Sequence, residues 1–275
     1  MVAPSNRVPP DLPAKLAALT ARLYPDRAPE IRFHPQCFLS CGHFAGSDAE
    51  RAAAFLEVAN DPSIDVLWFG RGGYGSFRLT EAVLAGLQAP AGDKLYMGYS
   101  DAGAMLGALY GAGVGRVAHG PMPADLNRAG GEAAVARALA FLVEGNADAL
   151  EPSVAAAPTA AFNITILSHL IGTPMLPDLT GHVLMLEEIA EPMYRIDRAL
   201  GQITSTPALR QVAGIKLGRC GDIPANDPDF MQDEEEVVRY WCARSGIAYL
   251  GRADIGHDVG NKVVPFGTWG RERGA

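Results

Sequence analysis

Apolar residues in the first half of the chain alternate between helical spacing and short continuous runs. Leu12, Leu16, Leu19 and Leu23 recur every three or four residues, which predicts a helix over 11–24. Short apolar runs bounded by glycine or polar residues are typical of strands buried in a parallel sheet. The expected elements are strands at 2–3, 31–33, 64–69, 94–97 and 114–118, and helices at 11–24, 47–60, 79–87, 102–110 and 132–144.

The pattern changes after residue 145. Residues 146–161 are rich in alanine and proline and have no clear periodicity, which indicates a linker. Because strands and helices alternate with short joins on both sides of it, the sequence predicts an α/β fold with mainly parallel sheets, an N-terminal domain at 1–145 and a smaller C-terminal α/β domain at 162–275. After the linker we expect an apolar segment at 163–170, strands at 183–186, 212–217 and 248–250, and helices at 194–203 and 234–244.

Composition and charge exclude several classes of protein. With 48% hydrophobic and 20% charged residues, the chain has the profile of an ordinary globular protein. The net charge is −8 and no basic block stands out, so a nucleic-acid backbone would be repelled. The sequence contains no run of about 18 apolar residues, so no membrane span is predicted. The N-terminal residues lack the pattern of a secretory signal, and the expected compartment is the cytoplasm.

The four cysteines are too few for a disulfide framework in a chain of 275 residues. His34, Cys37, Cys41 and His43 lie within ten residues of one another, which raises the question of a zinc site. The single residue between Cys41 and His43 leaves little room for a tetrahedral set of ligands. Free thiols beside ordinary histidines are therefore the favoured interpretation, and no metal is expected.

Ser100 is the first candidate for chemistry. It stands between the strand at 94–97 and the small-residue helix at 102–110, so a tight turn would expose its hydroxyl beside a helix N-terminus. This is the setting of a nucleophile elbow, although Ala102 stands where the usual G-x-S-x-G motif has its second glycine. A plain helix N-cap serine explains the same residues, and the sequence leaves both interpretations open.

The glycine-rich segment 70–76 falls at the sheet edge where α/β proteins bind ligands. It matches neither the dinucleotide-binding nor the P-loop pattern. Gly72 and Gly73 would let backbone N–H groups approach an oxyanion closely. Tyr74 would form a wall of the pocket, and Arg71 would pair with a substrate carboxylate. An ordinary turn with positive φ is the alternative, which this segment alone does not exclude.

A base and an orienting acid are found in the second half. His257 lies on a loop rich in glycine and aspartate after the last predicted strand, which suits a general base, while His119 and His182 remain rivals. Glu187 ends an apolar run, and a carboxylate at a strand end can hold an imidazole in the tautomer that a base requires. Since Glu188 follows directly, a solvated acidic pair is the alternative interpretation.

Taken in order, these segments resemble the LD-carboxypeptidase family of Ser-Glu-His peptidases, which includes microcin-immunity relatives. The resemblance spans nearly the whole chain and implies an amidotransferase-like N-terminal α/β domain followed by a swivelling C-terminal domain. The similar blocks are VAPS, GSDAERA, RGGYGSFRL, GYSD, HGPM, LEEIAEPMYRIDRAL and GHDVGNKVVPFG.

The resemblance assigns roles that agree with the residue-by-residue interpretation. It implies that Ser100 is the nucleophile, Glu187 the acid and His257 the base. It also implies that the backbone N–H groups of Gly73 and Asp101 form the oxyanion hole. The nucleophile and its partners would then come from different domains, and the site would assemble where the domains meet.

The resemblance also implies a substrate class. This is a murein tetrapeptide whose terminal D-alanine is released in the cytoplasm, with Asn163 among the substrate-binding residues, no cofactor, and a homodimer. The alternative is a microcin-immunity-like peptidase that cleaves peptide–nucleotide or aminoacyl-adenylate conjugates.

The family usually shows Gly-Gly-Asn where this chain has Ala161-Phe162-Asn163, which leaves the pocket shape open. A glutamine amidotransferase would need cysteine in place of Ser100. A non-catalytic binding domain is disfavoured because all three triad positions are filled.

Overall fold

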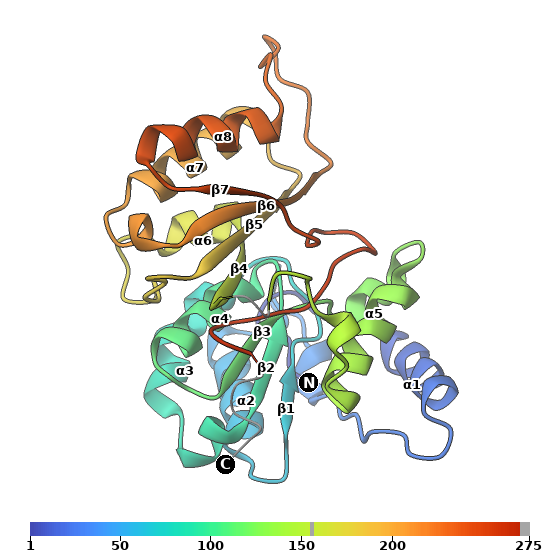
Figure 1. Cartoon of the computed structure of the whole chain (residues 1–275). Helices are drawn as coiled ribbons and strands as arrows, with labels where there is room; N and C mark the ends of the chain where they lie inside the picture. The colour runs from blue at the N-terminus through green and yellow to red at the C-terminus, as the bar shows by residue number, and fades with distance from the viewer. Residues whose placement is uncertain (155–156, 270–275) are drawn as a thin grey trace.

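The computed structural model describes residues 1–154 and 157–269. These residues form two four-stranded sheets, with strand orders β1-β2-β3-β8 and β4-β5-β6-β7, which lie in the lower and upper lobes of Figure 1. The strands are β1 (Val66–Trp68), β2 (Leu95–Gly98), β3 (Arg116–His119), β4 (Thr159–Asn163), β5 (Val183–Ile189), β6 (Gly214–Gly221), β7 (Tyr249–Arg252) and β8 (Val264–Pro265). The α-helices are α1 (Leu12–Leu23), α2 (Asp48–Asn60), α3 (Thr80–Gly86), α4 (Ala102–Gly111), α5 (Gly131–Leu139), α6 (Ile164–Leu170), α7 (Met193–Ser205) and α8 (Glu234–Ser245).

The first sheet is buried on both faces. Strands β1, β2 and β3 are parallel, and β8 returns from the far end of the chain to pair antiparallel with β3. Leu67 and Tyr96 pack in the core that includes residues of α2, α3 and α4, whereas Trp68 and Met97 pack with residues of α1 and α5. Successive strand residues point to opposite faces, so burial on both faces explains the continuous apolar runs.

The second lobe is an all-parallel sheet with α6, α7 and α8 packed on it, and it shares its main core with the first lobe. The contact between lobes depends on small residues of α4. A methyl group added at Gly107 would lie 3.1 Å from Leu170 and 3.3 Å from Phe162. The short side chains predicted along 102–110 therefore let α6 lie close against α4, which brings the ends of the two sheets together (Figure 1).

The α/β fold predicted from the sequence is confirmed, and most elements begin within a few residues of their expected positions. Helix α2, for example, begins at a capping box formed by Ser47 and Glu50. The strand predicted at 31–33 is wrong: these residues have no strand partner among the described residues. Among the helices of the described ranges, none is long and apolar enough to cross a membrane.

Two strands were not predicted. Strand β4 begins at Thr159, inside the segment predicted to be a linker. It was missed because alanine-rich residues give a weak strand signal, although every residue of β4 is buried. Strand β8 contains only Val264 and Pro265, too short for any alternating pattern. It nevertheless fastens the C-terminal part of the chain to the N-terminal sheet, as Figure 1 shows.

Candidate active site

Ser100 occupies a strained turn between β2 and α4. Its φ is +61°, a conformation that residues other than glycine seldom adopt. The N-cap position of α4 belongs to Asp101, one residue later, and its side chain makes no capping hydrogen bond. An N-cap serine would have extended backbone angles, so the N-cap interpretation of Ser100 is wrong and the turn has the backbone of a nucleophile elbow.

The glycine-rich loop passes directly against Ser100. A methyl group added at Gly72 would lie 3.1 Å from Cβ and 3.3 Å from Oγ of Ser100. Gly73 has a φ of +118°, and a methyl group there would lie 2.5 Å from Cγ of Asn6. Gly73 is favoured by its positive φ and by its contact with Asn6, whereas a side chain at Gly72 would press on Ser100.

The side chain of Asp101 ties the elbow to two other segments, a role that the sequence did not reveal. Its Oδ2 accepts hydrogen bonds from the Ser5 hydroxyl at 2.5 Å and from the Ser76 amide at 2.8 Å. The Ser76 hydroxyl in turn donates to the Asp101 carbonyl at 2.5 Å. Because the three residues are distant in sequence, no local pattern signals this junction of N-terminal segment, glycine-rich loop and elbow.

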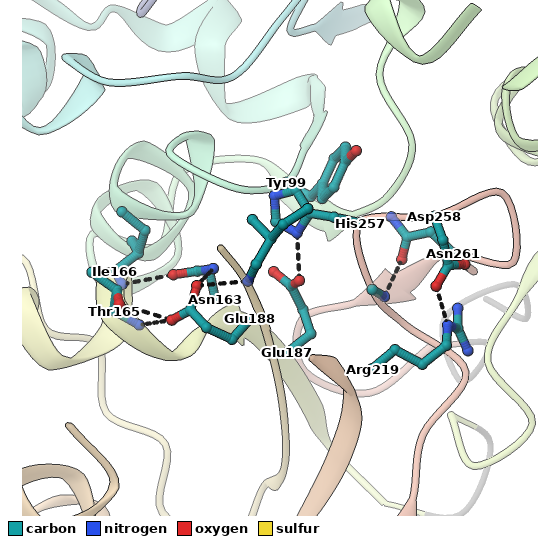
Figure 2. Close-up of polar contacts among 12 residues, drawn as sticks. Tyr99, Asn163, Thr165, Ile166, Glu187, Glu188, Arg219, His257, Asp258 and Asn261 are labelled. Carbon is teal, nitrogen blue, oxygen red and sulfur yellow. Dashed lines mark hydrogen bonds and ion pairs between the residues drawn. The ribbon is translucent and has the colours of Figure 1, made fainter. Parts of the chain in front are cut away.

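Glu187 and His257 meet in a buried contact within the C-terminal part of the chain. Oε2 of Glu187 lies 2.5 Å from Nδ1 of His257, and the two side chains are 0% and 4% exposed (Figure 2). A carboxylate only accepts hydrogen bonds, so Nδ1 carries a proton, and in the neutral imidazole Nε2 then presents its lone pair. Nε2 is buried without a hydrogen-bond partner among the described residues. The solvated acidic pair considered from the sequence is wrong, since Glu188 is buried as well.

Strand β5 directs its two glutamates differently. Its pairing with β6 shifts register between Leu186 and Glu188, an irregularity of the kind that re-aims side chains. Glu188 accepts a hydrogen bond from the side-chain amide of Asn163 at 2.5 Å. It also accepts from the backbone N–H and the hydroxyl of Thr165, at 2.9 and 2.7 Å (Figure 2). Burial raises the pKa of Glu188. Oδ1 of Asn163 also caps α6 by accepting from the Ile166 amide at 3.1 Å.

The imidazole of His257 reaches the elbow through Tyr99. The two ring centroids are 4.8 Å apart, and Tyr99 directly precedes Ser100. The structure thus brings the predicted acid and base of the C-terminal lobe to the residue that precedes the predicted nucleophile of the N-terminal lobe. No hydrogen bond joins His257 Nε2 to Ser100, and such bonds are often long before substrate binds.

The rival histidines have other partners. His119 lies with its Nε2 3.1 Å from the side-chain oxygen of Asn261, and burial lowers its pKa to about 4. His182 lies with its Nε2 2.7 Å from the Tyr110 hydroxyl. Among the described residues, His257 is therefore the only histidine paired with Glu187.

The predicted pocket residues at the loop are exposed. Arg71 donates a hydrogen bond to the backbone carbonyl of Arg7 at 3.2 Å. The side chain of Tyr74 is 54% exposed, and its ring centroid lies 6.0 Å from those of both His43 and Phe44. In the two described ranges, no three His, Cys, Asp or Glu side chains gather in a metal-binding arrangement, including those at 34–43.

Comparison with known proteins identifies the class. Residues 1–120 match the LD-carboxypeptidase N-terminal domain and residues 158–271 match the LD-carboxypeptidase C-terminal domain. A Streptomyces coelicolor protein named as a putative carboxypeptidase is 33% identical, over 98% of this chain and 87% of that protein. The murein tetrapeptide carboxypeptidase of Pseudomonas aeruginosa is 26% identical, over 82% of this chain and 78% of that enzyme. These matches place the protein among the carboxypeptidases, which are hydrolases. The chain belongs to the LD-carboxypeptidase family.

Solved structures confirm the fold. The muramoyltetrapeptide carboxypeptidase from Oxalobacter formigenes superposes with a TM-score of 0.76 at 24% identity, covering 97% of this chain and 92% of that one. The microcin C7 self immunity protein MccF, in complex with aspartyl sulfamoyl adenosine, superposes with a TM-score of 0.72 at 17% identity, covering 97% and 93%. The two-lobed α/β arrangement is thus shared with both.

Proposed function

We propose that the protein is a serine carboxypeptidase that releases the terminal D-alanine from a murein tetrapeptide. The observation that carries this proposal is the buried contact between Glu187 and His257, which lies against the residue preceding Ser100. A carboxylate, an imidazole and a hydroxyl on a strained turn are the parts of a nucleophilic triad. The substrate class is supported by the Pseudomonas aeruginosa relative, which is named for murein tetrapeptide.

In the proposed mechanism, Oγ of Ser100 attacks the carbonyl carbon before the terminal D-amino acid while Nε2 of His257 accepts the hydroxyl proton. The N–H groups of Gly73 and Asp101 stabilise the oxyanion, a contribution of roughly 3 kcal/mol for each donor in comparable sites. His257 then gives the proton to the departing amine. Water, deprotonated by the same histidine, hydrolyses the acyl-enzyme and releases Ser100.

The substrate contacts in this proposal come from three residues. Arg71 would pair with the terminal carboxylate, since its guanidinium is exposed and donates one hydrogen bond, to the backbone carbonyl of Arg7. Tyr74 would wall the pocket beside Gly73. Asn163 would shape the pocket from the N-terminus of α6. Its side-chain amide donates one hydrogen to Glu188, so the second hydrogen can bind substrate. The cytoplasmic location and the homodimer expected from the sequence stay predictions.

A second candidate substrate is a peptide–nucleotide or aminoacyl-adenylate conjugate. The observation that favours it is the exposed ring of Tyr74, which gathers with His43 and Phe44 beside the glycine-rich loop. Aromatic faces of this kind stack on nucleobases. The fold similarity to MccF, solved with aspartyl sulfamoyl adenosine, is compatible with the same chemistry on a different leaving group.

One experiment separates these possibilities. Wild type and Ser100→Ala are incubated with murein tetrapeptide and with an aminoacyl-adenylate analogue, and the products are followed by mass spectrometry. Release of D-alanine by the wild type alone supports the first proposal. Cleavage of only the adenylate analogue supports the second, and turnover of neither rejects both substrate classes. Equal turnover by wild type and Ser100→Ala rejects the covalent mechanism.

A further inference from the structure

The loop that carries His257 belongs to the C-terminal part of the chain but is held by the N-terminal lobe. Arg137 donates hydrogen bonds to the carbonyls of Val259 and Asn261 at 3.0 and 2.8 Å. The side-chain oxygen of Asn261 also accepts from the Gly256 amide at 3.2 Å. These contacts fix the loop as a whole but none of them involves His257 itself.

A second set of contacts converges on His257. Arg128 donates to the backbone carbonyl of His257, and its Nε lies 3.3 Å from Oδ1 of Asp125. The same oxygen of Asp125 accepts from the Tyr99 hydroxyl at 2.7 Å. The ring of Tyr99 packs on the imidazole, with centroids 4.8 Å apart (Figure 2). This series of contacts begins at the backbone carbonyl of His257 and ends at its imidazole ring. It therefore restrains both the backbone and the side chain of His257.

Asp125 and Tyr99 are themselves held in place. Asp125 accepts a hydrogen bond from the Met122 amide at 2.9 Å through its second oxygen, so its orientation is set by its own turn. Tyr99 is 2% exposed and immediately precedes Ser100 in the chain. The group that packs on the predicted base is therefore continuous with the turn that bears the predicted nucleophile.

We propose that Tyr99, Asp125 and Arg128 are positioning residues that hold His257 in register with Ser100. The proposal rests on the Ser-His chemistry of the proposed function. Glu187 fixes one nitrogen of the ring but does not prevent rotation about that contact, and Arg137 holds the loop at Val259 and Asn261 but not at His257 itself. Packing by Tyr99 opposes the rotation, and the hydrogen bond from Arg128 holds the backbone of His257. A misplacement of about 1 Å in a catalytic group costs roughly 100-fold in rate.

The test measures serine reactivity without the natural substrate. A fluorophosphonate reacts when Ser100 Oγ attacks phosphorus, fluoride leaves and His257 takes the proton, so its labelling rate reports on the base. Labelling is followed by intact mass spectrometry. In parallel, kcat and KM are measured for release of D-alanine from murein tetrapeptide, and the melting temperature reports on folding. We expect Arg128→Ala to lower the labelling rate and kcat about 10- to 100-fold, with KM changed less than about threefold. Arg128→Lys should restore part of the loss, and Tyr99→Phe, which keeps the ring, should lose about 3- to 10-fold.

Arg137→Ala is the matched control, because Arg137 anchors the same loop without touching His257. We expect its labelling rate to stay within about threefold of wild type. Wild-type rates in Arg128→Ala, or equal losses in Arg128→Ala and Arg137→Ala, overturn the positioning role while leaving the proposed function intact. A wild type that is not labelled at Ser100, or a Ser100→Ala variant that remains active, instead rejects the proposed function itself.

Discussion

The Glu187 carboxylate lies 2.5 Å from Nδ1 of His257, although 70 positions separate the two residues in the chain. Both side chains are almost fully buried, so the contact is not weakened by solvent. Its chemical consequence is a fixed tautomer with the lone pair on Nε2. This single relationship turns an ordinary loop histidine into a candidate base, and it leads to the first prediction.

Replacing Glu187 by glutamine should abolish most activity without unfolding the protein. An amide can donate to Nδ1, which stabilises the tautomer that has its proton on Nε2 and so cannot accept the proton of Ser100. We expect kcat to fall about 10⁴-fold, the size of the loss in a triad whose acid becomes an amide. Release of D-alanine and far-ultraviolet circular dichroism measure the two effects. Activity within tenfold of wild type would contradict the assignment of Glu187.

Gly72→Ala should impair catalysis because the added methyl group meets Ser100. Contacts of 3.1 Å to Cβ and 3.3 Å to Oγ are too close unless the serine shifts. We expect kcat to fall about 100-fold and the free energy of unfolding to fall by roughly 1–3 kcal/mol. Gly92→Ala is the matched control, since a methyl group there meets no atom within 4 Å. Equal kcat in the two variants would show that Gly72 does not constrain the serine.

Asp101→Ala should destabilise the fold at the junction behind the elbow. The substitution leaves the Ser5 hydroxyl and the Ser76 amide without the buried acceptor that they share. Unsatisfied buried donors cost about 1–3 kcal/mol, and urea unfolding would measure the loss. Asp101→Asn, whose amide oxygen can still accept, should lose less. Asp93→Ala at an exposed position is the control, and an equal loss there would refute the junction's contribution.

The contribution of His119 to stability should fall on mild acidification. Burial lowers the pKa of His119 to about 4, below the value of about 6.5 in the unfolded chain. Between these values the unfolded state binds more protons than the folded state, so this contribution is present above pH 6.5 and is lost as the pH falls towards 4. The loss from pH 7 to pH 5 is roughly 2 kcal/mol.

His119→Gln isolates this contribution, because the glutamine amide can still bond to Asn261 but does not titrate. Urea unfolding of both proteins at pH 7 and pH 5 gives the comparison. The variant should lose less stability than wild type over this interval, even though the buried carboxyl groups of Asp125 and Glu188, whose pKa values burial raises, act in the opposite direction in both proteins. Identical losses would show that His119 is not held neutral.

The sequence by itself determined the alternation of strands and helices, because the periodicity of apolar residues depends only on local geometry. It also identified Ser100, Glu187 and His257 as candidates, since each lies at the end of an element or on a loop where parallel sheets bind ligands. Local signals left the N-cap interpretation of the serine open, because the same residues suit both turns and only the φ of +61° separates them.

Only the tertiary structure decided which of these candidates meet. The hydrogen bonds of Asp101 to Ser5 and Ser76, and the pairing of the two-residue strand β8, join segments far apart in the chain. The hydrogen bond from Arg128 to the His257 carbonyl does the same for the base. None of these contacts has a local periodicity, because each joins segments that only the folded chain brings together. Hydrophobic patterning specifies which face of an element is buried, but it does not specify which polar side chains the buried faces bring together.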